Sequence, residues 1–196
     1  MAALLLAETV PPQGHVLVLG AGGGLELKVF AEAQPGWRFA GVDPSAEMLK
    51  LATATLGPLA SRVELIEGYV DTAPQGPFDG ATCLLTLHFL SIEQRLYTLT
   101  ELARRLKPGA PLVVAHHSFP QTEDQKMRWL NRYAAFAAAS GVPAENTKSA
   151  AVAIGSRLPL LAPEQEEALL QEAGFRSVEL FYAAFTFRGW VAYKPT

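Results

Sequence analysis

The sequence predicts an α/β fold in which a mostly parallel sheet is covered by helices on both faces. Short apolar or β-branched runs alternate along the chain with amphipathic runs of about ten to sixteen residues. Only 18% of the 196 residues are charged, against about a quarter in an average protein, so most of the chain is expected to be buried. We therefore expect one domain, residues 1–196, with a sizeable core.

Five strands alternating with three helices are expected in the first part of the chain. The strands are Val16–Leu19, Arg38–Val42, Arg62–Ile66, Gly80–Thr86 and Pro111–His116, and the helices are Gly24–Ala33, Ala46–Thr55 and Ile92–Leu106. Each helical pattern is followed at once by a breaker pair, Pro35-Gly36, Gly57-Pro58 or Pro108-Gly109. The strand–helix–strand crossovers should be right-handed.

The pattern changes after Ser118. A long helix is expected over Gln121–Ser140, whereas Gly141–Ala162 has little periodicity, and together residues 119–162 resemble an insertion or lid. A helix begins at Pro163 with an acidic first turn and ends before Gly174. Two closely spaced strands, Ser177–Ala183 and Phe185–Tyr193, should then pair as an antiparallel hairpin.

Composition and charge exclude several classes of function. A net charge of −3 and a pI of about 5.8 argue against a nucleic-acid partner. The lone Cys83 cannot form an internal disulfide, and the N-terminal residues have no secretory signal pattern, so we expect a cytoplasmic protein. The longest apolar run, Gly80–Leu90, is too short for a membrane span. No metal-ligand spacing is present.

A glycine-rich loop follows the first strand, in the segment Val16–Gly24. Glycines at this place let the backbone pass close to a ligand, and the amides at the start of the next helix face its polar groups. A dinucleotide-binding loop would carry a small residue where Leu25 stands. The alternative is a turn that only packs the helix tightly on the strand.

A carboxylate at the end of the second strand strengthens the interpretation. Asp43 follows Gly20 by 23 positions, and two adjacent strand ends share one crevice. Its two oxygens can accept from both hydroxyls of a ribose. The alternative role is that of a helix N-cap, for which Ser45 is better suited.

Taken in order, the motifs resemble those of the class I S-adenosylmethionine-dependent methyltransferases over Val16 to Lys194. They are Gly20-Ala-Gly22-Gly-Gly24, Asp43, Glu67-Gly-Tyr-Val-Asp71, Pro77-Phe-Asp79-Gly and Arg105-Leu-Lys-Pro-Gly109. The resemblance implies a Rossmann-like sheet of seven strands in the order 3-2-1-4-5-7-6, with strand seven antiparallel. The segment Leu85–Leu90 and the C-terminal hairpin look most like carboxy-S-adenosylmethionine synthase and its relatives.

The resemblance also implies a set of residues that bind the cofactor S-adenosyl-L-methionine. Gly20, Ala21 and Gly22 would contact the methionine part, Asp43 the ribose and Met48 the adenine face; Tyr69, Val70 and Asp71 would form the adenine rim, Leu85 would lie behind the sulfonium, and Pro44 and Gly68 complete the set. Two positions depart from the family pattern. Val18 stands where an acid usually helps to hold the cofactor's ammonium group, and Tyr69 stands where an Asp is common.

Three histidines are candidates for a general base, should the methyl acceptor carry a proton. His88 ends the fourth strand, and His116 and His117 end the fifth. Because neighbouring strand residues point to opposite faces, only one of the latter two can face the site. For each, the alternative is a hydrogen-bonded or exposed side chain without a catalytic role.

Acceptor-binding residues are expected on the long helix and in the lid. Trp129, Tyr133 and Phe136 share one helix face, which either packs on the core or lines an apolar pocket. In the second case Trp129 and Tyr133 would bind the acceptor, and Arg157 would pair with an acidic group on it.

The sequence thus predicts an enzyme that methylates a small molecule, with no nucleic-acid or membrane partner. One alternative is a carboxy-S-adenosylmethionine synthase, although Ala153 stands where that family carries an arginine. A nicotinamide dehydrogenase and a non-catalytic cofactor-binding module are further alternatives. The oligomeric state, a homodimer included, stays open.

Overall fold

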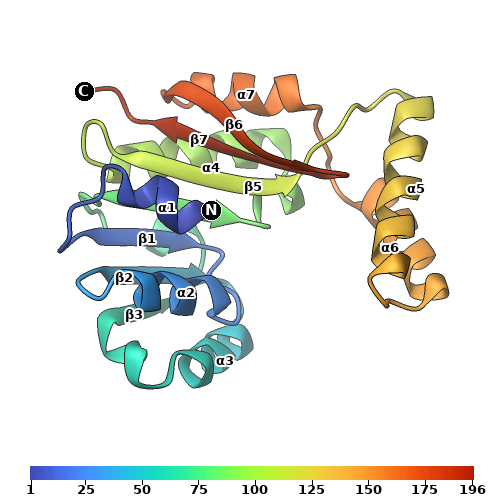
Figure 1. Ribbon diagram of the computed structural model, residues 1–196. Helices are drawn as coiled ribbons and strands as arrows, with labels where there is room; N and C mark the ends of the chain where they lie inside the picture. The colour runs from blue at the N-terminus through green and yellow to red at the C-terminus, as the bar shows by residue number, and fades with distance from the viewer.

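The computed structural model describes residues 1–196 as a seven-stranded sheet between two layers of helices (Figure 1). The strands are β1 (His15–Leu19), β2 (Arg38–Asp43), β3 (Val63–Glu67), β4 (Gly80–Leu84), β5 (Pro111–His117), β6 (Arg176–Ala184) and β7 (Phe187–Tyr193). Their order is β3-β2-β1-β4-β5-β7-β6, and only β7 runs antiparallel to its neighbours. The predicted topology is therefore confirmed.

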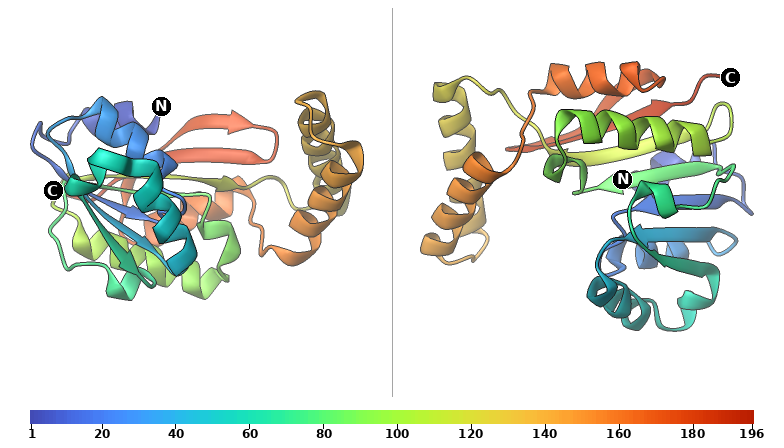
Figure 2. Two further views of the ribbon diagram at one scale, coloured as in Figure 1. Left: turned by 90° about the horizontal axis from the view of Figure 1, so that it is seen from below. Right: turned by 180° about the vertical axis from the view of Figure 1, so that it is seen from behind.

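Seven α-helices and three short 3-10 helices connect the strands. They are α1 (Ala2–Ala7), α2 (Leu25–Ala33), α3 (Ala46–Leu56), η1 (Gly57–Arg62), η2 (Val70–Thr72), η3 (Leu87–Phe89), α4 (Ile92–Arg105), α5 (Glu123–Ala139), α6 (Ala144–Arg157) and α7 (Pro163–Glu172). Helices α1, α2 and α3 cover one face of the sheet, and α4 and α7 cover the other (Figures 1 and 2). None of the helices combines the length and apolarity needed to cross a bilayer.

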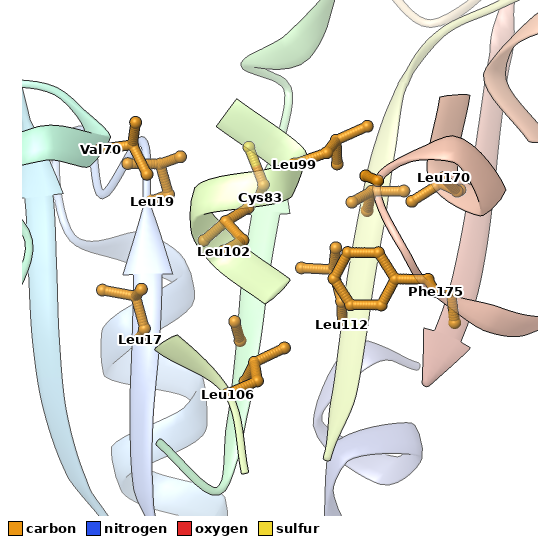
Figure 3. Packing of buried hydrophobic residues seen from close by; sticks show 14 of the residues in the cluster. Leu17, Leu19, Val70, Cys83, Leu99, Leu102, Leu106, Leu112, Leu170 and Phe175 are labelled. Carbon is orange, nitrogen blue, oxygen red and sulfur yellow. The ribbon is translucent and has the colours of Figure 1, made fainter. Parts of the chain in front are cut away.

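Two hydrophobic cores form because successive residues of each central strand point to opposite faces. In β1, Leu17 and Leu19 pack under α4 and α7, whereas Val16 and Val18 pack under α1 and α2. Figure 3 shows the first of these cores, with Leu17 and Leu19 among the side chains around Leu102 of α4. The strands thus read as continuous apolar runs because both of their faces are buried.

The main error of the sequence analysis lies in residues 141–162, which were expected to be irregular. Helix α6 occupies most of this range and pairs with α5 as a helical hairpin that stands beyond the carboxyl ends of the strands (Figures 1 and 2). Gly155, which suggests a helix breaker, lies instead at the contact between the two helices. A Cβ there would come 2.6 Å from Leu130 Cδ1, so the glycine allows the close approach.

A buried ionic network joins α4, α7 and β5 on one side of the sheet. The guanidinium of Arg95 contacts the Glu166 carboxylate and donates to the carbonyl oxygens of Pro159, at 2.9 Å, and Leu90, at 3.3 Å. His116 Nε2 lies 3.0 Å from the same Glu166 oxygen. Burial alone would raise the pKa of Glu166, but His116 and Arg95 outweigh it and hold that pKa below its usual value. Since Pro159 follows the helical hairpin, the network fixes its return to the body of the protein.

Replacing Glu166 with Gln should destabilise the fold strongly, because Arg95 would stay buried without a counter-charge. We expect the free energy of unfolding in urea to fall by about 3–5 kcal/mol. Glu164→Gln, on the exposed side of the same helix, is the matched control and should change it by less than about 0.5 kcal/mol. Equal effects of the two variants would contradict the structural role of the network.

Candidate functional site

The carboxyl ends of β1, β2 and β3 are joined by backbone hydrogen bonds. The N–H groups of Gly20 and Ala21 donate to the carbonyl oxygen of Val42, at 2.8 and 3.0 Å, and Gly68 N–H donates to the carbonyl of Asp43 at 3.0 Å. Three loops therefore meet at this edge of the sheet. In doubly wound folds this edge is where ligands bind.

Two glycines of the loop after β1 are required by its geometry. Gly20 has a φ of +78°, and a Cβ there would come 2.0 Å from Thr86 Oγ1. Gly24 has a φ of +79°, and a Cβ there would come 2.9 Å from Ala52 of α3. A side chain at either position would push the loop away from Thr86 or from α3. The positive φ would in addition strain any residue other than glycine.

Asp43 holds the glycine loop on one side and the start of α3 on the other. Its Oδ2 accepts from Gly22 N–H and its Oδ1 from Ser45 N–H, both at 2.9 Å. The helix cap is Ser45, whose Oγ accepts from Met48 N–H at 3.2 Å. Since a carboxylate has about four acceptor positions, Asp43 retains the capacity to accept from a ligand.

A cleft of about 610 Å³ opens beside Asp43, within the range of about 300–1,000 Å³ that is usual for small-molecule sites. It is lined by Leu19, Gly20, Val42, Pro44, Gly68, Tyr69, Val70, Asp71, Thr86, Phe89, Leu90, Gln94, Tyr97 and Thr98. This set combines apolar walls with one carboxylate and several hydroxyls. It contains no lysine, arginine or histidine, which suits a ligand that itself carries positive charge.

Six of the eleven residues expected to bind the cofactor line this cleft, namely Gly20, Pro44, Gly68, Tyr69, Val70 and Asp71. The other five, Ala21, Gly22, Asp43, Met48 and Leu85, are next to lining residues in the chain or against the glycine loop. The end of the Met48 side chain, for example, lies 3.7 Å from the position of a Cβ on Gly22. The structure thus gathers the expected cofactor residues at one edge of the sheet.

One wall of the cleft comes from the beginning of α4, which the sequence analysis did not consider. Gln94, Tyr97 and Thr98 line this wall. The Tyr97 hydroxyl donates a hydrogen bond to the carboxylate of Asp71, which belongs to η2. Spacings of three and four residues place these side chains on one helix face. That periodicity is the signal from which they could have been found.

Leu85, directly after β4, has a strained backbone. Its φ is +55° although it is not a glycine, and its side chain is 55% exposed. This conformation costs roughly 1–2 kcal/mol, and a hydrogen bond from Leu85 N–H to the Ala115 carbonyl at 2.6 Å helps to hold it. Strained non-glycine residues cluster at functional sites, and Leu85 is next in the chain to Thr86, which lines the cleft.

Comparisons with known proteins agree with this geometry. Residues 16–109 match the family model of a methyltransferase domain. Two relatives are carboxy-S-adenosyl-L-methionine synthases, from Chromohalobacter salexigens and Wolinella succinogenes. The first is 28% identical over 92% of this chain and 68% of its own length, and the second is 29% identical over 96% and 80%.

Among solved structures, the S-adenosylmethionine-dependent methyltransferase SibL superposes with a TM-score of 0.71 at 18% identity. The match covers 97% of this chain and 52% of SibL. The chain thus spans about half the length of this structural relative.

The segment that matches the methyltransferase domain model, residues 16–109, runs from β1 to the loop before β5 and makes up just under half of the chain. The domain match and the sheet order confirm the class I methyltransferase fold that the motifs predicted. They also support the enzyme class that the motifs predicted, a methyltransferase.

The histidines expected to serve as a general base are not among the residues that line the cleft. His116 lies on the α4 and α7 face, in the network with Glu166. His117 points to the opposite face, where its Nδ1 lies 2.9 Å from Thr186 Oγ1. The two rings point to opposite faces of the sheet, as the alternation of side chains along a strand predicts. Both rings are buried, His116 against Glu166 and His117 against Thr186.

His88 is buried against His117, with ring centroids 5.0 Å apart, and precedes the lining residue Phe89 in the chain. It accepts the backbone N–H of His117 at its Nδ1, at 3.3 Å, so the neutral ring carries its proton on Nε2. Burial, with smaller contributions from His117 and His116, lowers the pKa of His88 to about 3. Burial and His116 lower that of His117 to about 4. Both rings are therefore neutral at physiological pH, and His88 can donate a hydrogen bond through Nε2 but lacks a free lone pair.

The residues expected to bind the acceptor are dispersed. Tyr133 of α5 packs edge-on against His117 and Phe187, with ring centroids 5.7 and 6.0 Å apart. Trp129 lies against the guanidinium of Arg188, which is 5.2 Å from the ring centroid. Arg157, at the end of α6, is exposed. The structure brings Tyr133 to the histidines but leaves Arg157 apart from them.

We expect His88 and His117 to stay neutral in the folded protein down to about pH 5, because protonation would charge a buried ring. Histidine ring resonances followed by NMR against pH measure this directly. Since the unfolded rings protonate near pH 6.5 and the folded rings only near pH 3 to 4, the free energy of unfolding should fall as the pH drops below 6.5. A ring of either residue that titrates near its ordinary pKa would contradict this burial.

Proposed function

We propose that the chain binds S-adenosyl-L-methionine in this cleft and transfers its methyl group to a small-molecule acceptor. The observation that carries the proposal is the position of Asp43, which ends β2, holds the glycine loop and borders a cleft without cationic side chains. The adenine would lie against Tyr69 and Val70 with Asp71 at its rim. The ribose would lie at Asp43, and the methionine part at Gly20–Gly22 and Leu85.

In this proposal the protein acts mainly by holding the reactants in position. When bound, the cofactor supplies a methyl group made electrophilic by its sulfonium. Phe89 and Leu90 would exclude water from one side, and Gly20 and Thr86 would fix the backbone beside the reacting atoms. Alignment at about 3 Å can supply much of the acceleration. Because no histidine or lysine lines the cleft, we expect an acceptor whose nucleophilic atom needs no strong base from the protein.

The first test is a calorimetric titration of the purified protein with S-adenosylmethionine, S-adenosylhomocysteine and NADH. We expect micromolar binding of the first two and none of NADH. Binding of NADH alone would favour the dehydrogenase alternative, and binding of none of the three would contradict the proposal.

A carboxy-S-adenosylmethionine synthase is the second candidate, because relatives bear that name. Such an enzyme needs a cation to hold the carboxylate formed on the cofactor. No arginine or lysine lines the cleft, Ala153 and Arg157 lie on the projecting helix α6, and Arg95 is already paired with Glu166. Incubation with S-adenosylmethionine and prephenate, followed by mass spectrometry, separates the two functions. A carboxylated cofactor would reverse our order of preference.

Asp43→Ala should weaken the binding of S-adenosylhomocysteine by roughly 30- to 150-fold, because two charge-assisted hydrogen bonds to the ribose are replaced by water. Calorimetry measures the dissociation constant. Ser45→Ala is the matched control: it removes the cap of α3 but keeps the carboxylate, so it should lower the melting temperature and change the dissociation constant by less than about threefold. An Asp43→Ala protein that binds as tightly as the wild type would exclude the ribose role.

A further inference from the structure

Glu26 has a buried carboxyl group that neither the fold nor the proposed site uses. It is the second residue of α2, directly after the glycine loop, and its Oε1 accepts from the Thr82 hydroxyl of β4 at 2.7 Å. None of the ion pairs of the molecule involves it. A buried carboxylate without a cation is costly, so its presence directly after the glycine loop calls for a reason.

The strand register explains where this carboxyl lies. Thr82 is paired with Val18 of β1, and both side chains point to the face covered by α2. Val18 is fully buried and apolar. Glu26 therefore brings a carboxyl from the helix to the level of Val18, two residues before Gly20, the first glycine of the loop.

The location corresponds to the methionine end of the cleft. Asp71 and Tyr69 mark one end of the lining, at β3, whereas Gly20 and Thr86 mark the other, between β1 and β4. Glu26 lies below this second end, because its hydrogen-bond partner belongs to β4. Of the other acids at this edge, Asp43 already accepts from two backbone amides. Asp71 accepts from the Tyr97 hydroxyl at the opposite end of the lining, which leaves Glu26 as the carboxyl available at the second end.

We propose that Glu26, held by Thr82 beside the apolar Val18, supplies the negative charge that receives the α-ammonium group of the bound cofactor. This inference rests on the proposed cofactor site and adds a binding residue to it. A bound cation would neutralise the carboxylate where the protein itself provides no positive group.

The protonation of Glu26 fits this role. Burial raises the pKa of its carboxyl to about 7, and the hydrogen bond from Thr82 acts in the opposite direction. The neighbouring titratable group is the Cys83 thiol, whose own pKa is raised by burial first and by Glu26 next. The affinity for a ligand with an ammonium group should therefore rise as the pH increases through about 7, because only the ionised carboxylate attracts it.

The test compares S-adenosylhomocysteine with its des-amino analogue, which lacks the ammonium group. We expect the wild type to bind the first about 10- to 100-fold more tightly. Glu26→Gln should abolish this preference and leave the affinity for the des-amino analogue unchanged. Glu32→Gln, on the exposed side of the same helix, should keep the preference. A Glu26→Gln protein that still discriminates between the two ligands would overturn the inference.

A second variant keeps the test decisive if Glu26→Gln alters the loop. Adding Val18→Asp to Glu26→Gln returns an acid to the same level of the sheet, and we expect it to restore at least part of the preference. If Glu26→Gln binds neither ligand and the double variant also fails to restore binding, the residue is structural and the inference is wrong. If the wild type binds neither ligand, the proposed cofactor site itself fails, which is a separate outcome.

Discussion

The architecture of the site depends on the Asp43 carboxylate, which accepts hydrogen bonds from two backbone N–H groups. One amide belongs to the glycine loop and the other to the start of α3, so a single side chain sets the spacing between the ends of β1 and β2. The positive φ of Gly20 lets the loop lie against Thr86, and the cleft opens between these fixed parts. Without this carboxylate, the loop after β1 would be held to β2 only by the backbone hydrogen bonds from Gly20 and Ala21 to Val42.

Because side chains alternate along a strand, the neighbouring residues His116 and His117 make different contacts on the two faces of the sheet. On the α4 and α7 face, His116 belongs to a buried ionic network that fixes the return of the helical hairpin. On the other face, His117 packs with Tyr133 and Phe187 at the base of that hairpin. Both histidines therefore lie where the body of the protein meets the segment over residues 119–162. We infer that this segment determines the acceptor.

The parts predicted correctly from the sequence are those set by local patterns. The strands, the glycine loop and Asp43 follow from apolar runs, breaker residues and strand ends, and the observed boundaries of the elements predicted correctly lie within two residues of the expected ones. Helix α6 was missed because its small residues give little hydrophobic periodicity and because Gly155, which serves helix packing, suggested a break. Glu26 could not be assigned, because its position depends on the register of β1 with β4. For the α4 wall, the sequence shows only a shared helix face, and the packing of α4 beside η2 brings that face to the cleft.

The most direct test of the account is a crystal structure of the protein with S-adenosylhomocysteine. The account predicts the ribose hydroxyls within hydrogen-bond distance of Asp43, the adenine against Tyr69 and Val70, and the amino group directed toward Glu26. A ligand bound elsewhere, or a ribose that makes no contact with Asp43, would contradict the central claim that this carboxylate organises the cofactor site.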